Sequence, residues 1–328
     1  MTTKINPVFL TLPFAKSDWR LALFQLINTL VPYTALWALA AWEIRVNIFL
    51  TILTSIIASG FYIRIFIIFH DCGHGSFSPS KYFNNLLGFI LGMLFFVPYR
   101  HWTYEHALHH STSGNLDHRG RGDVWTMTLS EYHAASLWLQ QGYRLYRSPI
   151  TMILADMVLG FIILFRLPQT GKTPDSRWSI FVTNIALVIF WGSLVLWLGI
   201  VKVVIVQGTI FVVGSSVGIF LFFVQHTFEG VYWARDEEWD FHRSAMEGTS
   251  FFNLPRILHF FTGHIGYHHI HHLNPKVPNY HLRNAHLSHP IFLIAKYLTI
   301  KESFRTFYFK LWNEKEACLC SFPENNDE

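Results

Sequence analysis

The sequence predicts an all-α integral membrane protein, and the prediction rests on its composition and on several long apolar runs. Of the 328 residues, 51% are hydrophobic and 14% are charged, and the mean hydropathy is +0.28. Soluble domains carry about 25% charged residues. The net charge of +4 is modest and no Lys/Arg-rich stripe is present, which argues against nucleic-acid binding. We expect one domain over residues 1–328, with four transmembrane helices in two hairpins, interfacial helices and a cytosolic helical cap.

Four apolar segments are long enough to cross a bilayer, whose hydrocarbon core needs roughly 20 apolar helical residues. They lie at about 21–42, 46–69, 178–200 and 203–225. Two further segments, 85–99 and 150–166, are shorter, and Asp156 interrupts the second. We expect these two to lie in the membrane interface or to re-enter on the same side.

Histidines gather in three clusters, 70–74, 106–110 and 268–272, each beside an apolar segment. Within a cluster they are spaced i, i+4 or i, i+3, i+4, which places them on one face of a helix. One more histidine ends the last apolar segment. Nine imidazoles exceed the four ligands of a single zinc ion and indicate two metal ions, and nitrogen ligands of this kind suit iron. The nine expected ligands are His70, His74, His106, His109, His110, His226, His268, His271 and His272.

Clusters that share one metal site must lie on one side of the membrane, so the chain between them must cross an even number of times. That side also carries most of the loop arginines and lysines, and positively charged loops stay in the cytoplasm. We therefore expect the metal site and both termini to be cytoplasmic. The basic residues concerned are Arg119, Arg121, Arg144, Arg147, Arg166, Lys172 and Arg177.

Residues beside the clusters are candidates for orienting the ligands, because a metal-bound imidazole usually donates its other N–H to a carboxylate or carbonyl. His101 lies about 140° from His106 on a continuous helix. On the same geometry His264 falls within the ligand arc of the third cluster, and His269 lies about 60° outside it. The carboxylates could equally be ordinary surface groups. They are Asp71, Glu105, Asp117, Asp123 and Glu229.

The motifs HDCGH, HALHH and HHIHH resemble the three histidine boxes of the membrane fatty acid desaturases. The longer stretches PYRHWTYEHALHHSTSGNLDHRGRGDVWTMTLSEY, VQHTFE and GHIGYHHIHHLNPKVPNYHL are similar to bacterial acyl-lipid desaturases of the Bacillus delta-5 and omega-6 type. The resemblance covers most of the chain. It departs from the family pattern at His264, where that pattern has asparagine.

The resemblance implies two non-haem iron ions that use O₂ to introduce a cis double bond into an acyl chain of a membrane lipid. It also implies a separate ferredoxin- or flavodoxin-type electron donor and a place in the bacterial cytoplasmic membrane. The acyl chain would enter an apolar tunnel, although aromatic residues near a membrane more often belong to the core or to the interface. Candidate tunnel residues are Trp102, Tyr104, Trp125 and Tyr267.

Two alternatives remain open from the sequence. Related histidine boxes occur in hydroxylases and ketolases that act on alkanes or carotenoids. The second alternative is a metal transporter or histidine-rich binding protein, but transporters place their ligands near the bilayer midplane. Here each cluster lies at the end of an apolar segment, which argues against transport.

Overall fold

A computed structural model describes residues 6–120, 124–170 and 172–323 of the chain. Within this part, five helical segments are long and apolar enough to cross a membrane. Four of them coincide with the expected spans, which confirms the all-α membrane fold class. The five are α2 (Trp19–Glu43), α3 (Ile48–His74), the run Pro149–Arg166, α9 (Pro174–Leu198) and α10 (Ile200–His226).

Polar side chains cap the beginnings of α2 and α3, and a glycine follows the end of α3. Asp18 caps α2 by accepting from the backbone N–H groups of Arg20 and Leu21, and Asn47 caps α3 by accepting from Phe49. Such side chains satisfy N–H groups that have no partner within the helix. Helix α3 ends at Gly75, whose φ of 65° is the left-handed conformation that favours glycine. The first histidine cluster therefore forms the last turn of α3.

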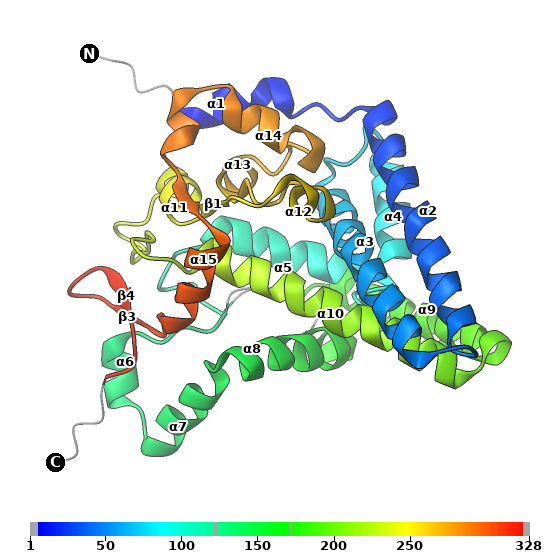
Figure 1. Ribbon diagram of the computed structural model, residues 1–328. Helices are drawn as coiled ribbons and strands as arrows, with labels where there is room; N and C mark the ends of the chain where they lie inside the picture. The colour runs from blue at the N-terminus through cyan, green and yellow to red at the C-terminus, as the bar shows by residue number, and fades with distance from the viewer. Residues whose placement is uncertain (1–5, 121–123, 171, 324–328) are drawn as a thin grey trace.

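Helices α2 and α3 form one hairpin and α9 and α10 form the other (Figure 1), and α3 packs closely on α2 and α10. A Cβ at Gly214 of α10 would lie 2.5 Å from the ring of Tyr62 in α3, so glycine allows this close approach. The turns of both hairpins lie at the same end of the molecule in Figure 1, away from α13. The histidine-bearing ends of α3 and α10 lie at the opposite end.

The segment Pro149–Arg166 differs from the expectation of a short interfacial element, because it is a continuous helical run with the length and composition of a span. It consists of α8 (Pro149–Ala155), a π-helical stretch Asp156–Ile163 and a 3₁₀ turn Leu164–Arg166. Arg147, just before it, is held by the carbonyls of Trp125 and Phe309. Its other end bonds to Asn184 of α9. An interfacial or re-entrant course for this segment stays a prediction.

The expected segment 85–99 divides into two elements, because α4 ends at Gly92 and α5 begins at Tyr99. The remaining helices are short and build the cap over the histidine-bearing ends. The shorter helices are α1 (Pro7–Thr11), α4 (Lys81–Gly92), α5 (Tyr99–Thr112), α6 (Leu129–Ala134), α7 (Leu137–Tyr146), α11 (Phe241–Glu247), α12 (Arg256–Phe261), α13 (His268–Leu273), α14 (Asn279–Leu287) and α15 (Ile300–Ser303).

Four strands of three residues each accompany the helices and were not expected from the sequence. Strands β1 (Ser250–Phe252) and β2 (Lys296–Leu298) pair in parallel, and β3 (Leu311–Asn313) and β4 (Cys318–Cys320) pair antiparallel. Three residues are too few to show the two-residue period by which a strand is recognised. The β3–β4 hairpin is joined to the cap by a bond from Trp312 N–H to the carbonyl of Met127.

Candidate metal centre

Four elements bring the nine expected histidines together. His70 and His74 lie on the last turn of α3, and His226 is the last residue of α10. The helices α5 and α13 supply three histidines each. Gly73, inside the first cluster, lets α5 approach α3, because a Cβ there would lie 2.9 Å from the ring of Trp102.

Five of the histidines form one group, whose potential ligand nitrogens all lie within 4.8 Å of one another. The Nε2 atom of His110 is 3.2 Å from Nε2 of His106 and 2.9 Å from Nε2 of His271. This group draws on α3, α5 and α13. Its members are His70, His74, His106, His110 and His271.

A second group contains His109, His226 and His272, again with ligand nitrogens within 4.8 Å of one another. Nε2 of His226 is 3.3 Å from Nε2 of His109 and 2.9 Å from Nε2 of His268, so His268 adjoins this group. The rings of His110 and His272 stack with centroids 4.2 Å apart and bring the two groups side by side.

The second and third boxes, on α5 and α13, therefore divide their histidines between the two groups, whereas both histidines of the first box belong to the first group. In α5, the i and i+4 pair His106 and His110 belongs to the first group, and His109 belongs to the second. In α13 the division is reversed, because His271 joins the first group while His272 joins the second. Residues at i and i+4 lie about 40° apart around a helix, whereas i+3 falls on the other side of i. A box with i, i+3, i+4 spacing can thus serve two neighbouring sites.

The donor set fits a pair of metal ions. Nitrogen ligands about 2.1 Å from a metal, at right angles to one another, lie about 3.0 Å apart. Four Nε2–Nε2 pairs here are separated by 2.9 to 3.3 Å. The Nε2 atoms of His74 and His272 are buried and find no hydrogen-bond partner in the described part of the chain. Buried polar atoms are normally satisfied, and a metal ion would satisfy these.

The surroundings keep the expected ligands in the form that binds metal. Burial lowers the pKa of His106, His110, His268 and His271 well below the ordinary value, and neighbouring imidazoles lower it further. Burial and the nearby His110 have the same effect on the pKa of His272. Neutral imidazole is the ligating form, so these side chains need not lose a proton before they bind a metal ion at neutral pH.

Asp71 is placed to orient one of the ligands. Its Oδ1 lies 3.1 Å from Nδ1 of His70, and its Oδ2 accepts from the backbone N–H of Asn279 at 2.7 Å and from Nδ2 of Asn279 at 2.8 Å. Gln25 of α2 donates in turn to Oδ1 of Asn279. A proton held on Nδ1 leaves Nε2 of His70 free to bind a metal ion.

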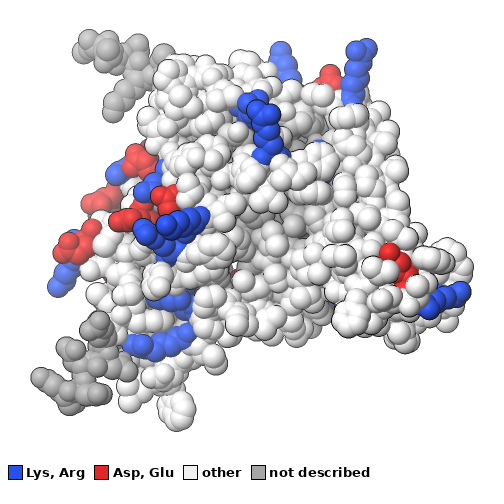
Figure 2. All heavy atoms as spheres, viewed as in Figure 1, with Lys and Arg blue, Asp and Glu red and all other residues white. Residues whose placement is uncertain are grey.

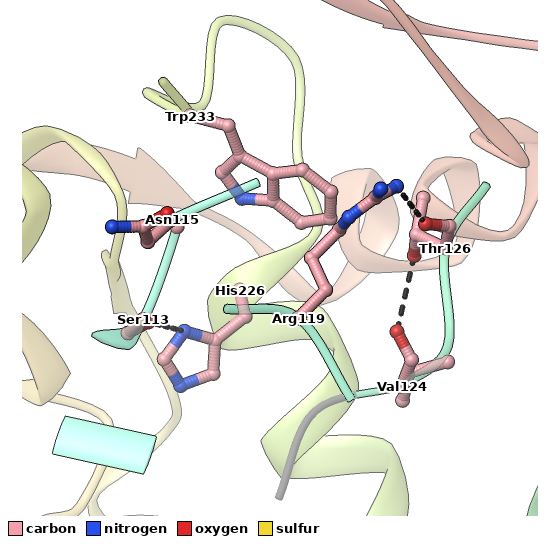
Figure 3. A pocket seen from close by; sticks show the side chains of 8 residues that line it. Ser113, Asn115, Arg119, Val124, Thr126, His226 and Trp233 are labelled. Carbon is pink, nitrogen blue, oxygen red and sulfur yellow. Dashed lines mark hydrogen bonds between the residues drawn. The ribbon is translucent and has the colours of Figure 1, made fainter. Parts of the chain in front are cut away.

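His226 has a comparable neighbour that sequence reasoning missed. The hydroxyl of Ser113 lies 3.4 Å from Nδ1 of His226, as Figure 3 shows. Both residues line a cavity of about 20 Å³, enough for one water molecule. Arg119 and Trp233 lie on other sides of this cavity. No sequence signal points to Ser113, because a serine just after a histidine box has many ordinary uses.

Similarity to known proteins identifies the family to which this chain belongs. The sequence profile of the family described as fatty acid desaturase matches residues 47–301, which is more than three quarters of the chain. The chain belongs to the fatty acid desaturase family.

Individual family members agree with this assignment. The chain is similar to a fatty acid desaturase of Bacillus subtilis (strain 168), with 43% identity over 94% of this chain and 88% of that protein. It is 28% identical to an sn-1 acyl-lipid omega-3 desaturase (ferredoxin) of Synechocystis, over 67% of this chain and 62% of the relative. It is 32% identical to an acyl-lipid omega-3 desaturase (cytochrome b5), endoplasmic reticulum, of Arabidopsis thaliana, over 67% of this chain and 58% of that protein.

Two of the other histidines expected near the desaturase centre lie apart from it. Nδ1 of His101 is 2.5 Å from the hydroxyl of Ser176 in α9, and its ring contacts Phe165. The expectation for His264 assumed a helix running through to His272, but α13 begins only at His268 and His264 has a φ of 59°. The ligand arc therefore does not extend to His264. His269 bonds to His286, with the two nitrogens 3.0 Å apart.

The remaining expected carboxylates have mixed surroundings. Asp117 forms an ion pair with Arg235 and accepts from the backbone N–H of Asp236, so it links two surface loops. Glu229 is exposed on the turn after α10, and Glu105 is half-buried on α5. Asp123 lies outside the described residues.

The four aromatic residues expected to line a tunnel do not share one location. The ring of Trp102 stacks on His106 with centroids 4.4 Å apart, so it forms a wall of the metal centre. Trp125 is 41% exposed and packs against Tyr143 and Tyr146. Tyr267 is buried and stacks on Phe251. Tyr104 is half-buried on α5.

Proposed function

We propose that this protein is an O₂-dependent di-iron desaturase that introduces a cis double bond into an acyl chain of a membrane lipid. The observation that carries the proposal is the pair of histidine groups at the membrane ends of α3 and α10, in a chain of the fatty acid desaturase family. Their nine imidazoles would be the ligands. Neutral nitrogen ligands suit iron.

The proposed reaction assigns different roles to the metal ions and to the side chains around them. Iron bound at the two groups would supply the activation of O₂ that removal of two hydrogens from unactivated methylenes requires, since no side-chain acid or base can break such bonds. The histidines would hold the ions, and Asp71 would keep His70 in the ligating tautomer. Trp102, stacked on His106, would help to exclude water from the centre.

Several features support a cytoplasmic, membrane-embedded enzyme with a separate electron donor. Helix α1 packs against α13 and the β3–β4 hairpin packs against α6, which supports placing both described ends of the chain on the side of the histidines. Arg-rich loops on that side favour the cytoplasm. Two relatives carry ferredoxin or cytochrome b5 in their names. We propose a ferredoxin- or flavodoxin-type donor and the bacterial cytoplasmic membrane for this chain.

The test is expression in a host whose lipids contain only saturated acyl chains, followed by lipid and metal analysis. We expect new monounsaturated chains and two iron ions per protein. The variant His271→Ala should abolish the product, whereas His133→Ala, which removes an exposed histidine on α6, should not. A product that carries oxygen would indicate a hydroxylase or ketolase instead. Folded, iron-loaded protein that yields no new lipid species would contradict the proposal.

A further inference from the structure

A second group of polar side chains lies outside the metal centre, in the part of the cap formed by α12, α13 and α14. Residues 248–301 contain no Asp or Glu. They contain five basic residues, which are Arg256, Lys276, Arg283, Lys296 and Lys301. In Figure 2 the surface over α12 and α14 shows Lys and Arg atoms without acidic ones. A region of this kind attracts anions.

His259 provides a buried donor that has no acceptor. Its Nε2 accepts from the backbone N–H of Leu254 at 3.3 Å, so in the neutral ring the proton must be on Nδ1. The side chain is 7% exposed, and among the described residues Nδ1 has no hydrogen-bond partner. An N–H group left in this state is costly unless a ligand accepts from it.

His264 lies beside His259 in a strained turn. The two rings are nearly parallel, at 17°, with centroids 5.5 Å apart, and Nδ1 of His264 is also buried without a partner in the described chain. Its φ of 59° is unfavourable for a residue with a side chain. Burial, and then the nearby His259, Arg64 and Arg283, lower the pKa of His264 to about 4, so the ring is neutral.

Two guanidinium groups lie near these two rings. Arg283 on α14 is exposed and close enough to lower the pKa of His259, after burial. Arg64 of α3 reaches the carbonyl of Phe260 and lies 4.0 Å from the centre of its ring. Two histidines and two cations from α3, α12, α14 and the turn before α13 thus lie near one another, and Arg64 also donates to the hydroxyl of Thr29 in α2.

The group lies beside a membrane span, next to a short helix with exposed aliphatic residues. Helix α12 lies along α3, where Gly60 leaves room for the ring of Phe261, and it exposes Ile257 (62%) and Leu258 (39%). A short helix with exposed aliphatic residues beside a membrane span is typical of the interface between acyl chains and headgroups. The turn that carries His264 leads directly to the ligands of α13.

We propose that His259, His264 and Arg283 bind a phosphoryl group, the headgroup phosphate of a membrane phospholipid. Arginine recognises phosphate through several parallel N–H groups. The unpartnered Nδ1–H group of His259, and Nδ1 of His264 when it carries the proton of the neutral ring, would complete the set of donors. Bound there, the phosphate would fix the headgroup at one side of α13, with the acyl chain extending toward the histidines. The inference deepens the proposed function, on which it rests for the identity of the substrate as a phospholipid.

The experiment measures binding to the purified, metal-loaded protein in neutral detergent. A fluorescent short-chain phosphatidylglycerol is titrated against wild type, Arg283→Gln, Arg283→Lys and the control Lys296→Gln, which removes an exposed cation on β2. Loss of charge-assisted bonds should weaken binding of Arg283→Gln about tenfold or more. Arg283→Lys should restore part of the affinity, and Lys296→Gln should bind like wild type. Equal affinities of wild type and Arg283→Gln, with equal melting temperatures, would refute the site.

Three competitors identify the source of the phosphoryl group. Inorganic phosphate should displace the lipid only weakly, and diacylglycerol with the same chains should bind poorly to every variant. Tight binding of phosphate alone, without displacement of the lipid, would overturn the lipid assignment. Preferential binding of acyl-CoA would overturn it too. Lipid binding and desaturation are measured separately. Reduced affinity in Arg283→Gln supports the phosphate site even if the wild type forms no unsaturated lipid. Desaturation by the wild type together with unchanged affinity in Arg283→Gln would refute the phosphate site but not the proposed desaturase function.

Discussion

Replacing Asp71 by asparagine changes one atom beside the proposed metal centre and tests how His70 is held. In the wild type one oxygen of the carboxylate accepts from the Nδ1–H group of His70, and the other accepts from two N–H groups of Asn279. An amide has a single acceptor oxygen. If that oxygen faces Asn279, the NH₂ group meets Nδ1–H of His70 and favours the opposite tautomer, which places the proton on the ligating Nε2. If the amide oxygen faces His70, the two N–H donors of Asn279 face an NH₂ group and lose their acceptor.

The expected cost follows from these contacts. Removing a group that orients a metal ligand typically lowers metal affinity or activity by about 10- to 100-fold. Each bond lost to the charged carboxylate should also destabilise the fold by about 1.5–3 kcal/mol. The assay is iron retention during titration with a chelator, together with the lipid profile. The matched control is Asp175→Asn, which alters an exposed carboxylate paired with Arg100. Unchanged iron retention in Asp71→Asn would refute the role of Asp71.

Two further predictions concern stability. Gly88→Ala places a Cβ 2.2 Å from the ring of Tyr99, whose hydroxyl bonds to the carbonyl of Cys72, so we expect a loss of about 1–3 kcal/mol and a lower melting temperature. Gly192→Ala, with nothing within 4 Å, is the control, and equal melting temperatures would contradict the packing argument. Metal-free protein should also lose stability as the pH falls below about 6.5, because the lowered pKa of His106 and His110 means that the unfolded state binds more protons than the folded one. A melting temperature that stays constant from about pH 7.5 to 5.5 would be inconsistent with this linkage.

The histidine pattern predicted the centre well because its spacing is a local property. His106, His109 and His110 share a helix, so their relative directions follow from 3.6 residues per turn. The division of the second and third boxes between two groups was not predicted, since it depends on how α5 and α13 are oriented toward one another. His264 illustrates the limit, because nothing in the sequence shows that α13 begins only at His268.

Features that depend on contacts between residues far apart in the sequence could not be predicted. Asp71 was a candidate because it adjoins His70, but its anchor Asn279 is more than 200 residues away. The hydroxyl of Ser113 reaches His226 across 113 residues of chain. The segment 150–166 was judged by the length of its apolar run, by Asp156 within it and by the even number of crossings between the clusters, and its π-helical stretch has no simple sequence signature.

The composition of the first histidine group also bears on the order of events during synthesis. His70 and His74 leave the ribosome roughly 200 residues before His271, which at about 5–20 residues per second is a delay of about 10 to 40 s. During that interval α3 can enter the membrane while its terminal imidazoles have no partners from α13. Binding of the proposed metal ion by the complete group would therefore be a late step, and a chain interrupted before residue 268 should be a membrane protein that lacks the centre.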